Sequence, residues 1–320
     1  MSMMKIPLLL CFFLLVGVIG FTGCVEEISR EDAIPDDAIK VTPETDRFPP
    51  VLHLDGWEDP IPMEGPVNTR GGEDACFITP DGNTFFFFFT PDVPVPANEQ
   101  LSDGVTGIWW CTKQGSSWTE PERVQLGQSV ALDGAPFYQD TILWFASFRV
   151  GNYRDDGDIW TAHYVNGQWT EIMNTGSQLN DVYNIGEMHL SNDGNTIYFH
   201  GENPSGDTDL YTTTWNQTHW DEPVTLGAPV NTELDDSRPF VTTDGTELWF
   251  TRPSMLGYTG PAVYRSLKKP DGSWSEPVEI ASNFAAEPTL DAAGNLYFGH
   301  HFFDAEMNMI EADIYVCYAS

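Results

Sequence analysis

Basic residues are scarce in this chain of 320 residues. Only 14 lysine and arginine residues stand against 48 aspartate and glutamate residues, so the formal net charge at pH 7 is −34. Because nucleic acids and anionic membrane surfaces are bound through clustered positive charge, we expect neither as a partner. A solvated acidic surface is the simplest interpretation of the excess carboxylates, although cation binding and a salty habitat are consistent with it.

The chain also lacks the motifs of common catalytic and metal centres. It has no His–Cys cluster with zinc spacing, no nucleotide-binding loop and no Gly-x-Ser-x-Gly turn. The acidic loop Arg154–Asp158 carries oxygen ligands of the kind that calcium takes. Its spacing matches no known calcium loop, and an ordinary β-turn accounts for it. We therefore predict no metal and no cofactor, with calcium at this loop as the alternative.

Cysteine is rare as well. Beyond the N-terminal region the chain has Cys76, Cys111 and Cys317, so any single disulfide would leave one thiol unpaired. Cys111 and Cys317 share a repeat position with small residues, which favours simple packing. The sequence leaves their disulfide state open.

Helical periodicity is absent beyond the N-terminus. Met1–Lys5 carries one positive charge, Ile6–Phe21 is apolar, and Thr22-Gly23-Cys24 follows. This layout predicts a signal peptide over residues 1–23 and lipidation of Cys24, with ordinary cleavage or an uncleaved anchor as alternatives. Residues 24–47 are acidic and aperiodic, which predicts a disordered tether. We therefore expect an exported, lipid-anchored protein at the cell envelope, on its periplasmic or extracellular face.

Glycine and aromatic residues, by contrast, are abundant and recur in a fixed pattern. Short aromatic runs lie between Gly, Asn, Asp and Pro clusters, which is typical of antiparallel strands joined by tight turns. The centres of the second strands are Phe85–Phe87, Leu143–Phe145, Ile197–Phe199, Leu248–Phe250 and Leu296–Phe298. Third strands follow at Ile108–Cys111, Ile159–Ala162, Leu210–Thr213, Val263–Ser266 and Ile314–Cys317. One such unit cannot bury both faces alone, so the repeats predict a ring of stacked sheets.

Tryptophan indicates how the ring closes. Trp118, Trp169, Trp220 and Trp274 each open a fourth strand, and the last repeat ends where its own should begin. A spare copy, Trp57 to Thr69, lies near the N-terminus. We therefore predict an all-β, five-bladed β-propeller over residues 48–320, with four-stranded antiparallel blades and the last blade closed by the N-terminal strand. The predicted blades cover residues 71–127, 128–179, 180–230, 231–282, and 283–320 together with 48–70.

The repeat motif resembles that of a known family. Ser191–Phe199 followed by Asp209-Leu210-Tyr211, with the later Trp-x-x-Pro, resembles the WD-repeat-like propeller repeats of the TolB type. The resemblance spans residues 48–320. It implies a propeller fold and a binding scaffold, but no particular ligand.

First strands of a propeller line its central channel, so their polar residues are the candidate site. Aligning the repeats places Ala75, Ala135, Glu187, Arg238 and Glu287 at one equivalent position. Asp74, Asp133 and Asp236 fall just before it, and we expect them at the same channel mouth. Converging carboxylates and one arginine could bind a cation or a polar ligand, or form a network that satisfies itself.

Two functions follow as expectations. The favoured one is a monomeric, non-enzymatic binding propeller for an envelope protein, a glycan or a small polar ligand. The alternative rests on a resemblance to arabinanase-type five-bladed glycosidases, which implies catalysis by carboxylates on the first strands of blades one to three, here Asp74, Asp133 and Glu187. Two carboxylates flanking a glycosidic bond would supply the acid and the base or nucleophile. A deep pocket would favour the hydrolase and a plugged channel the binder.

Overall fold

The computed structural model describes residues 29–100, 103–127, 131–155 and 157–320. These residues form an all-β protein whose helical segments are short: α1 (Arg30–Ala33), α2 (Ala97–Gln100) and the π-helix η1 (Gln178–Val182). No helix of the described part is long and apolar enough to span a membrane. The predicted signal peptide, residues 1–23, and the predicted lipidation site Cys24 lie outside the described residues.

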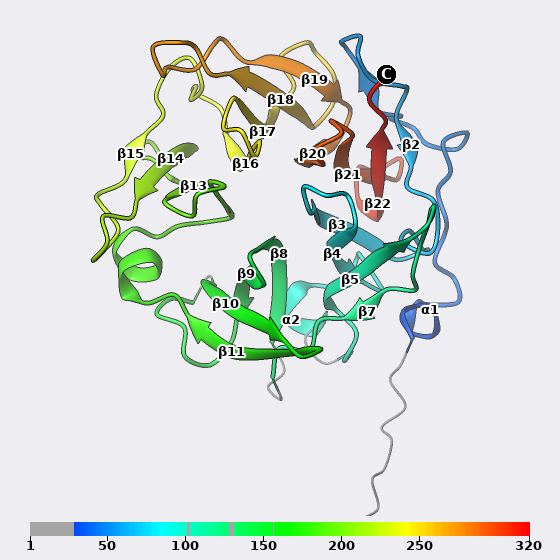
Figure 1. The fold of residues 1–320 in the computed structure, drawn as a ribbon. Helices are drawn as coiled ribbons and strands as arrows, with labels where there is room; N and C mark the ends of the chain where they lie inside the picture. Colours follow the sequence, from blue (N-terminus) through cyan, green and yellow to red (C-terminus); the bar gives the residue numbers. More distant parts are fainter. Residues whose placement is uncertain (1–28, 101–102, 128–130, 156) are drawn as a thin grey trace, which may run out of the picture.

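Each sequence repeat forms one antiparallel unit, because its aromatic runs pair in chain order across tight turns. Figure 1 shows these units arranged around a common centre. The first unit is β3 (Gly72–Ile78), β4 (Thr84–Thr90), β5 (Gly107–Gln114), β6 (Ser117–Trp118) and β7 (Glu122–Arg123). The second is β8 (Leu132–Gln139), β9 (Ile142–Phe148), β10 (Asp158–Val165) and β11 (Gln168–Asn174).

The later repeats follow the same plan. The third unit is β12 (Met188–Leu190), β13 (Thr196–Glu202), β14 (Thr208–Thr214) and β15 (Val224–Thr225). The fourth is β16 (Ser237–Val241), β17 (Glu247–Pro253), β18 (Pro261–Leu267) and β19 (Val278–Ser282). The last is β20 (Ala285–Leu290), β21 (Leu296–Phe303) and β22 (Met309–Cys317), which a single parallel pair, Ala312 with Gly72, joins to β3.

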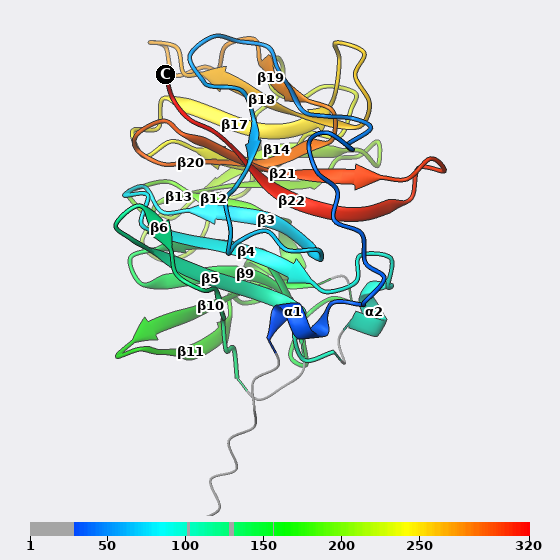
Figure 2. The same ribbon diagram turned by 90° about the vertical axis from the view of Figure 1, so that its right-hand side faces the viewer.

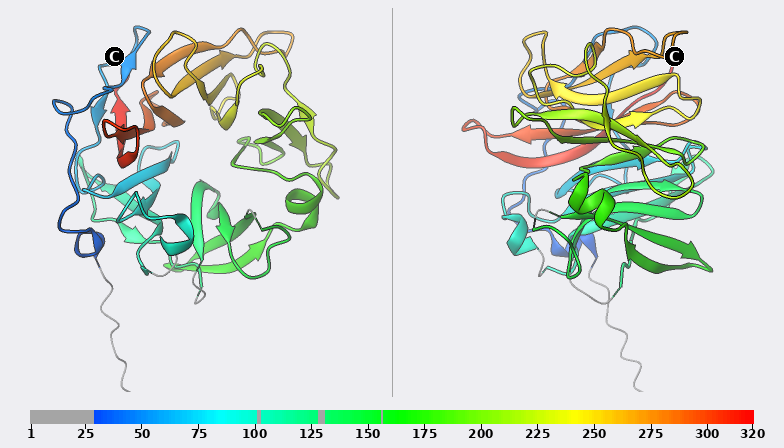
Figure 3. Two further views of the ribbon diagram at one scale, coloured as in Figure 1. Left: turned by 180° about the vertical axis from the view of Figure 1, so that it is seen from behind. Right: turned by 90° about the vertical axis from the view of Figure 1, so that its left-hand side faces the viewer.

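The N-terminal segment adds strands to two units rather than one. β2 (Ile61–Pro62) pairs with β22 of the last unit. β1 (Val51–Leu52), however, pairs with β19 of the fourth unit, so the predicted assignment of residues 48–70 to the last blade is corrected there. Figure 2 shows this blue segment crossing the outside of the ring, and Figure 3 shows it beside the red C-terminal strand from behind.

The repeated tryptophans occupy one equivalent place. Each pairs antiparallel with a residue within two positions of the end of the third strand of its unit: Lys113 with Trp118, Tyr164 with Trp169, Trp215 with Trp220, Lys268 with Trp274, and Ala319 with Trp57. Trp57 therefore stands in the last unit where the other four stand in theirs. Its indole Nε1 donates to the Gly294 carbonyl at 2.8 Å.

The prediction of a disordered tether over residues 24–47 is wrong for the part that the structure describes. Residues 29–47, here called the strap, lie against the propeller. Arg30 Nη1 is 3.2 Å from Glu73 Oε1, and Lys40 Nζ is 2.6 Å from both Glu311 Oε1 and Asp313 Oδ1. The three carboxylates are buried. A buried carboxylate is costly without a cation, so two basic residues fix a segment whose composition alone indicated disorder.

Candidate functional site

The channel mouth is built by a bulge that recurs in the first strand of four repeats. Pairing with the second strand slips between Asp74 and Phe77, Gly134 and Phe137, Ser237 and Phe240, and Ala286 and Thr289. Within each slip one residue takes a left-handed conformation: Ala75 (φ 47°), Ala135 (φ 49°), Arg238 (φ 53°) and Glu287 (φ 59°). A bulge of this kind re-aims a side chain and is common beside functional sites.

The aligned position does converge, as the sequence predicted. A cavity of ≈ 50 Å³ is lined by Ala75, Ala135, Glu187, Arg238 and Glu287. Two residues further along the chain, four of the five repeats carry a ring, Phe77, Phe137, His189 and Phe240, and the fifth carries Thr289. Their rings contact one another, with centroids 5.1 Å apart for Phe77–Phe137, 4.5 Å for Phe137–His189 and 4.6 Å for His189–Phe240. These rings form one wall of the mouth cavity, which has room for only a few water-sized groups.

Arg238 lies between two glutamates in this mouth. Its Nε is 2.5 Å from Glu287 Oε1 and 3.4 Å from Glu187 Oε2. The side chains of Arg238 and Glu187 are 38% and 30% exposed, whereas that of Glu287 is only 8% exposed. Burial, reinforced by the charge of Asp74, raises the pKa of Glu287 well above its ordinary value. The charges of Glu187 and Glu287 raise the pKa of Arg238 and keep it cationic.

Asp74 does not line this cavity but lies beside it, because its charge acts on both Glu287 and Arg238. Asp74 pairs with a residue that the sequence alignment did not select. Its Oδ2 is 3.0 Å from Nε2 of His301, at the end of β21. Burial would raise the pKa of Asp74, but His301 and Arg238 outweigh it, and the pKa lies below its ordinary value. A side chain at Gly299 would come within 2.4 Å of Asp74 Oδ1, so this glycine leaves the carboxylate its space. The only signal for His301 in the sequence was its place in a pair, His300-His301, at a strand end.

Polar atoms remain unpaired at the mouth and beside it. Among the described residues, buried atoms without a hydrogen-bond partner include Asp74 Oδ1 and Glu287 Oε2. The Arg238 Nε also lacks hydrogen-bond geometry to a partner, despite its close ion pair. Buried carboxylate oxygens are rarely left unpaired, so these two indicate a place that a water or a ligand donor fills.

Asp133 and Asp236 do not line the mouth, contrary to prediction. Arg149 Nη2 is 2.5 Å from Asp133 Oδ1, and Arg252 Nε is 2.6 Å from Asp236 Oδ1. Ser147 also donates to Asp133 at 2.6 Å. The sequence alignment placed these aspartates near the mouth because it could not detect the bulge, within which the residue two positions on, Ala135 or Arg238, lines the cavity instead.

These pairs belong to a repeated structural unit. In three repeats a guanidinium lies over aromatic rings of the second and third strands: Arg30 over Phe87 and Trp109, Arg149 over Phe145 and Trp160, and Arg252 over Phe250 and Tyr264. Each also donates to a backbone carbonyl, of Val67, Leu126 and Val230 respectively. Arg30 of the strap thus occupies, in the first repeat, the place that an arginine on or just after the second strand occupies in the other two. The aspartates of this unit are structural.

The remaining sequence candidates are not gathered into a site. Within the described part, no group of three or more His, Cys, Asp or Glu side chains could hold a metal ion. In the acidic loop, Asp158 Oδ2 accepts hydrogen bonds from the Tyr153 backbone and the Asn174 side chain. Cys76, Cys111 and Cys317 are buried free thiols.

Comparison with known proteins shows the fold. No protein-family model and no curated protein matches the chain. A GH62 α-L-arabinofuranosidase catalytic domain from Coprinopsis cinerea is 14% identical; the alignment covers 83% of this chain and 97% of that one, with a TM-score of 0.52. A thermostable family-43 glycoside hydrolase is 11% identical, with coverage of 79% and 91% and a TM-score of 0.51. A putative TolB from Agrobacterium tumefaciens is 13% identical, with coverage of 79% and 92% and a TM-score of 0.44. The likeness to the two hydrolases, whose TM-scores exceed 0.5, shows that this chain has a β-propeller fold and, at such identities, says nothing of its activity.

Proposed function

We propose that this protein is an exported, lipid-anchored binding propeller whose channel mouth holds a small zwitterionic molecule. The observation that carries the proposal is the charged mouth itself: the partly exposed Glu187 and Arg238, of opposite sign, lie side by side at a cavity that Glu287, with its unpaired Oε2, also lines. An ammonium group is water-sized and donates three hydrogen bonds, so it suits this cavity. A carboxylate beside it meets Arg238, which faces outward.

A second hollow gives the rest of such a ligand its place. Arg238 also lines a neighbouring groove of ≈ 370 Å³ whose other residues include Ser237, Ser254 and Tyr258. This volume lies in the range of about 300–1,000 Å³ that is usual for small-molecule sites. The ligand's charged head would occupy the mouth, and its side chain would lie in the groove.

The propeller that carries this mouth has, in our proposal, five blades and a ring closed by the N-terminal strand. The pairing of Trp57 with Ala319, equivalent to the other four tryptophan pairs, supports both the count and the closure. Export and anchoring through Cys24 rest on the N-terminal sequence pattern alone.

The glycosidase alternative has less support from the geometry. Of its three carboxylates, Asp133 is bound by Arg149 and Ser147, so it is not free to act on a substrate. The mouth cavity of ≈ 50 Å³ is also far smaller than a sugar-binding pocket requires.

A binding screen with a parallel hydrolysis assay tests the proposal. The full chain, held in a polyoxyethylene detergent that has neither charge nor sugar, is titrated calorimetrically with each of the α-amino acids. Butylamine and butyrate serve as single-charge controls. We expect at least one amino acid to bind and both controls to bind at least tenfold more weakly. Absence of amino-acid binding, or cleavage of aryl arabinofuranosides that Glu187→Gln abolishes, would overturn it.

A further inference from the structure

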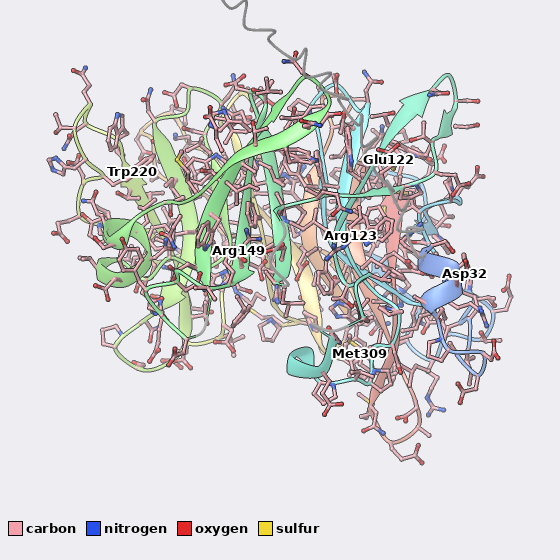
Figure 4. All side chains as sticks on the ribbon, turned by 90° about the horizontal axis from the view of Figure 1, so that it is seen from below. Asp32, Glu122, Arg123, Arg149, Trp220 and Met309 are labelled. Carbon is pink, nitrogen blue, oxygen red and sulfur yellow. The ribbon has the colours of Figure 1, made fainter. Side chains whose placement is uncertain are left out.

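Away from the channel, an aromatic hollow lies on the outer flank between the first and second units. It has a volume of ≈ 370 Å³ and is lined by Trp110, Tyr164 and Trp169, with Glu122, Arg123 and Gln168 around them. Glu122 and Arg123 form β7, which lies on the lower right flank of the ring in Figure 1, and both are labelled in Figure 4. None of these residues lines the mouth.

The three rings form a corner rather than a flat patch. The Trp110 ring stands at 80° to that of Trp169 and at 70° to that of Tyr164, with centroids 6.0 Å and 5.2 Å apart. Beneath it the fully buried Phe86 lies nearly parallel, at 15° and 5.9 Å. Because this packing fixes the Trp110 ring, the corner is formed before any ligand arrives, which lowers the entropic cost of binding.

Comparison among the repeats shows that the corner is not required by the fold. At the position of Trp110 the other repeats carry Thr161, Thr212, Arg265 and Val316. At the position of Tyr164 they carry Lys113, Trp215, Lys268 and Ala319. Trp169 alone is common to every repeat. The propeller therefore tolerates small or charged residues where this flank places two extra aromatic rings.

Polar groups of both kinds surround the rings. Glu122 and Gln168 are exposed. The Arg123 Nη2 donates to the Thr106 carbonyl at 2.9 Å, and its buried Nε has no hydrogen-bond partner among the described residues. The rim thus offers the Glu122 carboxylate as an acceptor, the Gln168 amide as donor and acceptor, and the Arg123 guanidinium, which Thr106 fixes in place. The charges of Glu122 and Arg123 are of opposite sign.

We propose that this flank hollow binds a neutral glycan chain. A sugar ring has an apolar C–H face that stacks on an aromatic ring, and hydroxyls that both donate and accept at its edge. The corner supplies the first need, and the mixed rim supplies the second. The site is separate from the mouth and does not depend on its function.

Other occupants fit the hollow less well. The net charge of −34 opposes an anionic polysaccharide. A polyproline segment also docks in aromatic grooves, but it presents mainly carbonyl acceptors, so it has no use for the Glu122 carboxylate. An uncharged, hydroxyl-rich chain uses every group at the rim.

Calorimetry on the full chain in the same detergent tests this inference with cellohexaose, xylohexaose, mannohexaose, maltohexaose and chitohexaose. We expect at least one hexasaccharide to bind, and Trp110→Thr, which installs the residue of the next repeat, to weaken it at least tenfold. Tyr164→Ala, near the surface, should also weaken hexasaccharide binding, and it provides the test if Trp110→Thr fails to fold. Trp215→Ala, at the equivalent place one repeat on, is the matched control and should bind like the parent.

The mouth variant Glu187→Gln should also bind the hexasaccharide like the parent, because the two sites are separate. The inference would be overturned by no hexasaccharide binding up to 10 mM, by equal binding of the parent and of folded Trp110→Thr and Tyr164→Ala, or by binding of a proline-rich decapeptide in place of every glycan. A loss of binding in Glu187→Gln alone would place the glycan at the mouth and would equally overturn it.

Discussion

Several buried carboxylates in this acidic protein are paired with lysine or arginine. Glu73 is met by Arg30, Asp133 by Arg149, and Asp236 by Arg252. Glu311 and Asp313 share Lys40. Of the 14 lysine and arginine residues in the chain, four therefore pair with these buried carboxylates. Burial raises the pKa values of Glu73, Asp236, Glu311 and Asp313, so these carboxylates should affect the pH dependence of stability.

Glu311→Gln tests this at a single residue. Burial raises the pKa of Glu311 from its ordinary 4.5 to about 7 even with Lys40 beside it. Since the folded-state pKa is the higher one, its contribution to stability is fully present below about pH 4.5 and is lost as the pH rises through 7. Glutamine cannot lose a proton. Between pH 5 and pH 8 the free energy of unfolding of the variant should therefore rise relative to that of the parent, by roughly 3 kcal/mol at most.

Urea unfolding of both proteins at pH 5 and pH 8 measures that change. Glu306→Gln, at an exposed position of the β21–β22 loop, should show no such gain. If the free energy of unfolding of the parent relative to Glu311→Gln is the same or larger at pH 8 than at pH 5, the assigned role of Glu311 is contradicted.

Among the elements, the central strands were predictable and the bulges were not. Runs such as Leu143–Phe145 are apolar on both faces and bounded by turn residues, so their pattern predicts buried strands whatever the rest of the chain does. The bulged residues are Ala, Arg and Glu, which ordinarily avoid a left-handed φ, so no local signal marks them. As a result the alignment found Glu187, Arg238 and Glu287 correctly, but misplaced Asp133 and Asp236.

The strap was missed for a different reason. Its composition is that of a disordered segment, and the contacts that fix it involve partners more than 250 residues away, such as Lys40 with Glu311 and Asp313. No pattern within a short window can show such pairing. The same contacts make the strap's removal a test.

Deletion of residues 29–47 should destabilise the propeller. It leaves Glu73, Glu311 and Asp313 buried without their cations, and removal of one partner from a buried pair costs about 3–5 kcal/mol. Protonation of the carboxylates offsets part of that cost, so we expect a fall in Tm of about 10 °C. Scanning calorimetry of the deletion, of Lys40→Met and of the control Asp37→Asn measures it. An unchanged Tm for the deletion would mean that the strap is a passive tether after all.

For the whole molecule, the sequence repeats made the architecture and the position of the mouth predictable. Equivalent positions in a ring must converge at its centre, so the mouth followed from the repeat alignment without any knowledge of side-chain contacts. Ligand identity does not follow in this way, because the residues that distinguish one repeat from another, such as Trp110 and His301, carry no repeating signal. The proposed function therefore depends on ligand binding at the charged mouth.

Titration of the tightest-binding amino acid from the screen, at pH 6 and pH 8, tests that account most directly. An ammonium group favours the ionised form of Glu287, whose pKa is raised, so affinity should increase with pH and binding should release protons. Glu187→Gln should weaken binding about 10- to 100-fold, since it removes one charge-assisted hydrogen bond of about 1.5–3 kcal/mol, whereas Glu306→Gln should bind like the parent. Equal affinity of the parent and Glu187→Gln, with no dependence on pH, would show that the mouth is not the binding site.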